Sequence, residues 1–241
     1  MTQQPTGTIT FLFTDIEGST RMWERDSDAM QSVLARHDQL LRGAIESNGG
    51  YIFTTAGDAF AASFSDPLAG LTAALDAQSA LLAEPWDLEE VAVRMALHAG
   101  VAQERDGDYF GPTLNRTARI LSAGHGRQVL VSQAMSDLLA DRLPSGTALR
   151  SLGVYRLKDL GNPEHLHQID YLDPPTEFPP LRTLDSHINN LPIELSSFIG
   201  RHDELAETVK RLRDSRLVTL TGVGGSGKTR LALQTAAEAF D

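Results

Sequence analysis

The chain has 241 residues, no cysteine and a formal net charge of −11. Without cysteine, disulfides, thiolate catalysis and thiolate metal sites are excluded, so any metal site must use oxygen or imidazole ligands, which favours a hard cation. The negative charge argues against broad binding of nucleic acid or of an anionic membrane. We find no apolar run of about 18 residues and no signal peptide, so we expect a cytoplasmic protein without a membrane partner. The length predicts one full domain and part of a second.

The chain begins with a predicted strand, a turn and helices. Residues Thr8–Asp15 are rich in β-branched and aromatic side chains and predict a strand, after which Glu17–Thr20 opens a helical stretch. Apolar residues recur at helical spacing through Ser27–Glu46, and Asn48–Gly50 ends that helix.

A hairpin and further alternating elements are expected next. Strands at Tyr51–Thr55 and Ala59–Phe64 flank a turn that places Asp58 at its tip. Beyond the hairpin we expect helices at Pro67–Leu82, Thr113–Leu121 and Ala134–Ala140 and strands at Val91–Ala99 and Gln128–Ser132. This alternation predicts an α/β or α+β sheet with helices packed against it.

Proline-rich sequence predicts a linker and a second unit. We expect a first domain over residues 1–172, a linker over 173–194 and the beginning of another domain over 195–241. In the second unit, Glu204–Leu212 and Thr229–Ala239 read as helices and Leu217–Thr221 as a buried strand.

The sequence GVGGSGKT at residues 222–229 is a complete P-loop pattern between the expected strand and helix. Its amides would surround phosphates, Lys228 would reach the β and γ oxygens and Thr229 would hold Mg²⁺. The phosphate-binding candidates are Gly222, Gly224, Gly225, Gly227, Lys228 and Thr229. No second acidic strand follows before Asp241, so we do not expect this incomplete P-loop segment to hydrolyse ATP.

Two aspartates stand at predicted strand ends, Asp15 after FLFT and Asp58 at the hairpin tip. Such a pair can hold Mg²⁺ or Mn²⁺ against a triphosphate. Spacing alone favours the role of a simple turn former for Asp58.

Three motifs support a family resemblance: FTDIEGST at 13–20, NGGYIFTTAGDAFAASF at 48–64 and DYFGPTLNRTARILSAGHGRQVLVS at 108–132. In order and spacing they resemble the class III nucleotide cyclase catalytic domain, in the bacterial subgroup where it precedes a P-loop signalling ATPase. SSFIGRHDEL at 196–205 resembles the motif that introduces AAA and STAND-type ATPases. The resemblance implies a ferredoxin-like α+β fold for the first domain.

The resemblance implies a site with two divalent ions, Mg²⁺ or Mn²⁺, bound by Asp15, Asp58 and the carbonyl of Ile16. Gly18, Ser19 and Thr20 would lie near the substrate phosphates, where amides at a helix start attract an anion. Alternatively, Thr20 is a plain N-terminal cap of the helix.

The resemblance also implies roles for three later residues. Asp108 matches the base-reading aspartate of adenylate cyclases and would accept a hydrogen bond from the adenine amino group; alternatively it is an exposed loop acid. Asn115 and Arg119 match the residues that position the ribose and stabilise the pentavalent phosphate. They lie four apart on a predicted helix and share one face, for which spacing alone favours a solvated polar face.

The chain departs from the family pattern in the base pocket. Thr54 stands where the family has a base-reading lysine, and Ser19 replaces a common aromatic residue. Lys158 matches a lysine that contacts the triphosphate, or is a surface residue. Threonine can donate one hydrogen bond without charge, so we expect weaker base selection, by about 1–3 kcal/mol.

The resemblance therefore implies an adenylate cyclase that converts ATP to cyclic AMP and pyrophosphate in a head-to-tail homodimer with shared active sites. The alternative is a catalytically weak or inactive nucleotide-binding module that regulates a signalling ATPase or transcription regulator. We expect structural roles for His98 and His125.

Overall fold

A computed structural model describes residues 4–86, 91–171, 177–184, 201–215, 217–223 and 226–239. The chain divides into two compact units: residues 1–154 with 164–181 form the first, and residues 155–163 with 182–241 form the second. Among the described residues, no helix is long and apolar enough to cross a membrane.

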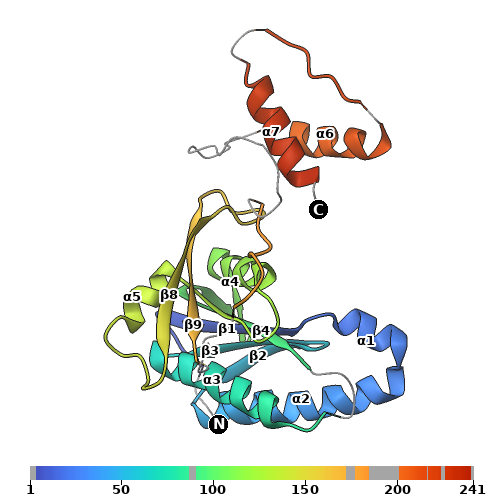
Figure 1. Cartoon of the computed structure of the whole chain (residues 1–241). Coiled ribbons are helices and arrows are strands. Elements are labelled where there is room, and N and C mark those ends of the chain that lie inside the picture. Colours follow the sequence, from blue (N-terminus) through green and yellow to red (C-terminus); the bar gives the residue numbers. More distant parts are fainter. Residues whose placement is uncertain are drawn as a thin grey trace. The chain divides into compact units, whose positions relative to one another are not determined.

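The first unit contains a mixed sheet with the strand order β2-β3-β1-β4-β7-β9-β8 (Figure 1). Strand β1 pairs antiparallel with both β3 and β4, and β4 pairs parallel with β7. The strands are β1 (Thr8–Ile16), β2 (Tyr51–Ala56), β3 (Ala59–Phe64), β4 (Val93–Val101), β7 (Val129–Ser132), β8 (Ala148–Tyr155) and β9 (Glu164–Asp170). The first four strands with their helices follow the βαββαβ order of a ferredoxin-like sheet, which confirms the predicted α+β class.

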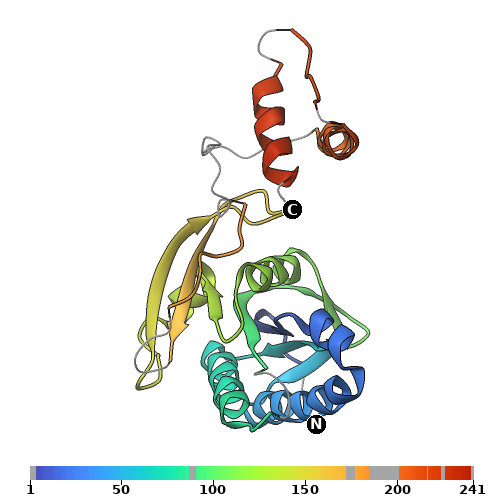
Figure 2. The same cartoon turned by 45° about the vertical axis from the view of Figure 1, so that its right-hand side comes forward.

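Helices cover both faces of this sheet. Figures 1 and 2 show α2 and α3 along one face and α4 on the opposite face. The helices of this unit are α1 (Ser19–Arg25), α2 (Ser27–Ser47), α3 (Pro67–Ala83), α4 (Pro112–Ala123) and α5 (Gln133–Leu139). A two-stranded ribbon, β5 (Gln103–Arg105) with β6 (Asp108–Phe110), completes the unit.

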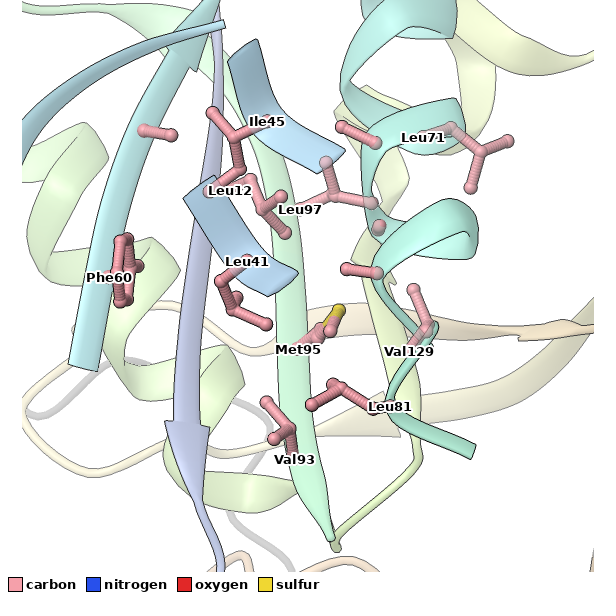
Figure 3. Packing of buried hydrophobic residues seen from close by; sticks show 14 of the residues in the cluster. Leu12, Leu41, Ile45, Phe60, Leu71, Leu81, Val93, Met95, Leu97 and Val129 are labelled. Carbon is pink, nitrogen blue, oxygen red and sulfur yellow. The ribbon is translucent and has the colours of Figure 1, made fainter. Parts of the chain in front are cut away.

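The main core lies between the sheet and the helices α2 and α3. Figure 3 shows Leu12 of β1 and Leu97 of β4 packed with Leu41 and Leu71 of the two helices, all fully buried. Each such side chain contributes roughly 1.5–3 kcal/mol on burial. Because β1 and β4 lie inside the sheet and are covered on both faces, most of their residues are buried, without the alternation of a half-exposed strand.

Local chemistry sets the ends of α2. The carboxylate of Asp26 accepts a hydrogen bond from the Ala29 amide at 3.0 Å and caps the N-terminus. The chain leaves the helix through Gly49, which has φ 72°, a left-handed conformation that favours glycine. At Gly50, a β-carbon would approach Ile45 Cγ2 and the Phe64 ring to 2.6 Å, so this turn packs closely against β3.

Four strands of the first unit lack a clear sequence prediction: β5, β6, β8 and β9. The turn of the β5–β6 ribbon is formed by Asp106 and Gly107, with φ 56° and 82°. An Asp-Gly pair of this kind is a strong hairpin signal and could have located the ribbon. Strands β8 and β9 contain polar residues and a glycine, Gly153, so their patterns resemble loop sequence.

The second unit contains two described helices, α6 (His202–Asp214) and α7 (Lys228–Ala239). Both were expected from the sequence, and α6 is longer at each end than predicted. The predicted strand at Leu217–Thr221 is wrong, because these residues form no strand and Leu217 is 81% exposed. A buried strand requires neighbouring strands to satisfy its backbone, and no described strand pairs with this segment. Of the predicted linker 173–194, only residues 177–184 are among those described.

His98 is buried in β4, on the face that α4 covers. Its Nδ1 lies 2.7 Å from the hydroxyl of Ser132, and the side chain is 3% exposed. Burial lowers the pKa of His98 from 6.5 to about 4, and the positive charge of Arg116 adds to this shift. The folded protein therefore keeps this ring neutral well below the pH at which an unfolded chain takes up a proton.

We expect this histidine to make the fold acid-sensitive. The contribution of neutral His98 to the free energy of unfolding is fully present above pH 6.5. It is lost as the pH falls toward 4, by roughly 2 kcal/mol between pH 7 and pH 5. In urea unfolding at these two pH values, His98→Asn should reduce the pH-dependent difference in unfolding free energy by about that amount. An unchanged difference would show that His98 does not titrate on unfolding in this range.

Candidate functional site

The two predicted metal aspartates lie at the same end of β1. Thr14 pairs with Phe60 at the end of the antiparallel β1–β3 ladder, and continuing this register by two residues puts Ile16 opposite Asp58. The Ile16 amide donates a hydrogen bond to Asp58 Oδ2 at 3.0 Å. Because the N–H and C=O of one strand residue point to the same side, the Ile16 carbonyl also faces the β2–β3 turn. The fold thus places Asp15, Ile16 and Asp58 together.

Arg94 is a member of this group that the sequence interpretation did not include. It stands directly opposite Asp15 in the β1–β4 pairing, and its Nε and Nη2 donate to Asp15 Oδ2 at 2.9 and 2.5 Å. The two side chains are 22% and 24% exposed. The sequence signal was available, because Arg94 is the one charged residue in the apolar run Val91–Ala99.

The chemistry of this group fits a hard divalent cation, since carboxylate and carbonyl oxygens are the ligands that Mg²⁺ and Mn²⁺ prefer. Within the described part of the chain, neither Asp15 nor Asp58 has a hydrogen bond to its Oδ1, so each carboxylate keeps one oxygen for a cation. Among the described residues, no three or more acidic, histidine or cysteine side chains form a group that could hold a metal ion. Further ligands would have to come from carbonyls, water or a bound substrate.

Thr54 and Asp108, the two predicted base-contacting residues, also lie together. A β-bulge at Phe53 shifts the β2–β3 register, so that Thr54 stands opposite Ala61. The Thr54 hydroxyl lies 3.5 Å from Asp108 Oδ1, at the outer limit of a hydrogen bond, and the Tyr109 amide donates to the same oxygen at 2.7 Å. Asp108 Oδ2 has no hydrogen bond to a described residue, so it can accept one from a ligand.

Aromatic packing holds this pair in place. The rings of Phe11, Phe53 and Tyr109 meet edge to face, with centroids 5.0–5.9 Å apart. The Tyr51 hydroxyl donates to the Gly107 carbonyl at 3.1 Å, which ties β2 to the turn before Asp108. The predicted base-contacting side chains, Thr54 and Asp108, therefore stand beside an aromatic cluster that joins β1, β2 and β6.

The loop after β1 carries the predicted phosphate contacts. Gly18, with φ 76°, is the N-cap of α1, which begins at Ser19. The alternative interpretation of Thr20 as the cap is therefore wrong: Thr20 is an exposed residue inside the first turn. Only a residue without a β-carbon adopts this left-handed conformation at little cost, so the cap position falls to glycine.

Glu17 anchors this loop and was not singled out from the sequence. Its Oε2 accepts a hydrogen bond from the Gly126 amide at 2.8 Å, and its own amide donates to the Ala92 carbonyl at 2.9 Å. His125 lies beside it, with Nδ1 3.9 Å from Glu17 Oε1 and Nε2 3.0 Å from the Pro180 carbonyl. These contacts support the structural role expected for His125 and join the loop to the segment after α4.

Asn115 and Arg119 form a third group on α4, one turn apart. Asn115 is exposed and Arg119 is half-buried. Among the described residues, no side-chain hydrogen bond joins Asn115 to the metal or base-contacting groups. The structure thus brings together Asp15 with Asp58 and Thr54 with Asp108, and no described side-chain hydrogen bond joins Asn115 to either pair.

The remaining candidates lie in the second unit. Lys158 is exposed there. Lys228 begins α7 and donates to the carbonyls of Gly222 and Val223 at 2.9 and 2.8 Å. Gly227 has φ 76°, and Thr229 is exposed in the first turn of α7. Gly224 and Gly225 lie outside the described residues.

Known proteins resemble this chain in sequence and in fold. An uncharacterised protein of Mycobacterium tuberculosis is 38% identical over 84% of the chain and 70% of its own length, and an adenylate cyclase of Schizosaccharomyces pombe is 28% identical over 93% of the chain but only 16% of its own length. Among solved structures, a monomeric Trypanosoma brucei adenylate cyclase has a TM-score of 0.69 at 24% identity, covering 74% of the chain and 95% of that protein. An adenylate/guanylate cyclase/hydrolase of Silicibacter pomeroyi has a TM-score of 0.62 at 27% identity, with 67% and 95% coverage. Residues 1–170 match the family described as the adenylate and guanylate cyclase catalytic domain, and the chain belongs to this family.

Proposed function

We propose that this chain is an adenylate cyclase that converts ATP to 3′,5′-cyclic AMP and pyrophosphate in a head-to-tail homodimer. The observation that carries the proposal is the hydrogen bond from the Ile16 amide to Asp58 Oδ2, because it gathers two aspartates at one strand end. The wider organisation belongs to the proposal too: a cyclase domain over residues 1–172, a linker over 173–194 and the start of a P-loop ATPase domain over 195–241.

Asp15, Asp58 and the Ile16 carbonyl would hold two Mg²⁺ or Mn²⁺ ions. Such ions make a ribose hydroxyl easier to deprotonate and neutralise charge on a pyrophosphate leaving group. The chain's own contribution is to fix these oxygens on adjacent strands, where the β1–β3 register and the Ile16 amide hold Asp58 in place. The loop at Gly18–Thr20 would meet the phosphates with backbone amides.

Recognition of the base would rest on Asp108 and Thr54. The open Oδ2 of Asp108 suits the exocyclic amino group of adenine, whereas guanine presents an oxygen there and would be repelled. Thr54 adds a neutral hydroxyl. Selection of ATP over GTP would therefore depend mainly on one carboxylate.

Asn115 and Arg119 would act on the ribose and on the reacting phosphate. Arginine suits the second role because its charge is fixed and its planar fork matches phosphate oxygens. In the proposed dimer, α4 with Asn115 and Arg119 would come from a second copy of the chain. The 3′ oxygen would attack the α-phosphate and pyrophosphate would leave.

Incubating the purified protein with Mn²⁺ and either ATP or GTP tests this proposal. We expect cyclic AMP and pyrophosphate from ATP and less product from GTP. Asp58→Ala should abolish the product, whereas Asp28→Ala, which removes an exposed acid in the first turn of α2, should not. Cyclic AMP formation that survives in Asp58→Ala would refute the assigned site.

A second candidate function is a nucleotide-binding module without turnover that regulates a downstream ATPase. It is favoured by Thr54, which cannot supply the charge of the family's lysine. This function predicts that ATP raises the melting temperature while no cyclic AMP forms. Product formation by the wild type would exclude it.

A further inference from the structure

Arg94 makes the most unusual contact near the candidate metal site. Both of its donating nitrogens bind one oxygen of Asp15, Oδ2, at 2.9 and 2.5 Å. A guanidinium and a carboxylate often meet through two separate oxygens, which occupies the whole carboxylate. Here Asp15 Oδ1 stays outside the ion pair.

The position of Arg94 is fixed by the sheet. Asp15 and Arg94 are directly paired residues of β1 and β4, and side chains that pair in this way lie on the same face of the sheet. Both are about three-quarters buried, so water screens their attraction less than it would on the surface. The strand pairing and this partial burial hold Arg94 beside Asp15.

In each of the two aspartates, Oδ2 accepts hydrogen bonds from the protein and Oδ1 accepts none from a described residue. Arg94 compensates the charge of Asp15 through Oδ2, as the Ile16 amide compensates Asp58 through its Oδ2. The two Oδ1 atoms are left for a cation. A fixed positive charge next to a ligand also repels that cation, because Coulomb interactions over a few ångströms are substantial in a partly buried site.

We propose that Arg94 sets the metal affinity of the cyclase site. Its charge stabilises the folded arrangement of Asp15 and Asp58 without metal, and it weakens the binding of a divalent cation in the absence of nucleotide. This inference rests on the proposed function of Asp15 and Asp58 as metal ligands. Binding would then become tight only when substrate phosphates add negative charge. Arg94 is a residue that tunes the site and does not itself bind metal.

The test is a titration of the full chain with Mn²⁺ in the absence of nucleotide, in which electron paramagnetic resonance measures the concentration of free Mn²⁺. Arg94→Gln removes the charge and should tighten binding about tenfold, equivalent to about 1.4 kcal/mol. It should also lower the melting temperature without metal and enlarge the rise produced by Mn²⁺. General damage to the fold would weaken Mn²⁺ binding, so tighter binding distinguishes the charge effect from a structural one.

Two controls accompany this variant. Arg94→Lys keeps the charge and should stay within about threefold of the wild type. Arg142→Gln removes the same charge from another ion pair of this unit, with Asp66 at 2.9 Å, and should leave Mn²⁺ affinity unchanged. Tightening in Arg142→Gln as well would show an effect of net charge and overturn the specific role of Arg94.

The remaining outcomes separate the two proposals. Saturable binding that is equal or weaker in Arg94→Gln overturns the role of Arg94 and leaves the metal site standing. If neither protein binds Mn²⁺ saturably, or if saturable binding is unchanged by Asp15→Asn, the metal site is overturned as well. If Arg94→Gln does not fold, Arg94→Met provides a second uncharged variant; recovery of folding in Mn²⁺ supports the proposal, and failure of both variants even with Mn²⁺ refutes it.

Discussion

Mixing the Asp58→Ala and Arg119→Ala proteins should restore about a quarter of the wild-type cyclase activity, although each variant alone should lose about a hundredfold or more. In the proposed head-to-tail dimer, each site would take its metal ligands from one copy and α4 from the other. Random exchange makes half of the dimers mixed, and each mixed dimer has one intact site and one doubly defective site. The measurement is cyclic AMP formation from ATP and Mn²⁺ after subunit exchange.

A second mixture provides the matched control. Asp15→Ala and Asp58→Ala both damage the metal group, so every site of their mixed dimer lacks one ligand and no recovery is expected. Mixed dimers can be isolated with two different affinity tags. An inactive mixed dimer can then be distinguished from a failure of the two variants to assemble. Isolated Asp58→Ala/Arg119→Ala dimers that remain inactive would contradict a site shared in this way.

Replacing Thr54 with lysine should raise kcat/KM for ATP by about 5- to 150-fold, which corresponds to about 1–3 kcal/mol of recognition. The Thr54 hydroxyl already lies 3.5 Å from Asp108 Oδ1, so an amine placed there can both pair with Asp108 and donate a charge-assisted hydrogen bond to the base. Steady-state kinetics with ATP and GTP measure the change.

Thr55→Lys is the appropriate comparison for this variant. Thr55 is the next residue of β2 and is also exposed, but successive strand residues point to opposite faces of a sheet. It adds the same charge away from Asp108 and should leave kcat/KM nearly unchanged. If the wild-type protein shows no turnover and Thr54→Lys is inactive as well, the result favours the regulatory nucleotide-binding module.

Much of the first unit follows from local pattern. The strand at Thr8–Ile16, the helix at Ser27–Ser47 and the hairpin around Asp58 were predictable, because their apolar periodicity, caps and glycine turns act over a few neighbouring residues. Strand β9 could not be recognised in this way, since its polar residues are buried by pairing with β7, far away in the sequence. Leu217–Thr221 shows the reverse case, an apolar run that forms no strand because no described partner strand pairs with it.

Motifs in the amino-acid sequence are enough to identify the chemically suitable residues, namely Asp15, Asp58, Asp108, Asn115 and Arg119. Their grouping in space is a property of the folded sheet. Asp15 meets Arg94 across 79 positions, and Thr54 meets Asp108 across 54, because strand register and a β-bulge bring them together. Register depends on the burial of whole strands and not on the residues of the site, so a charge partner such as Arg94 becomes visible only after the sheet has formed.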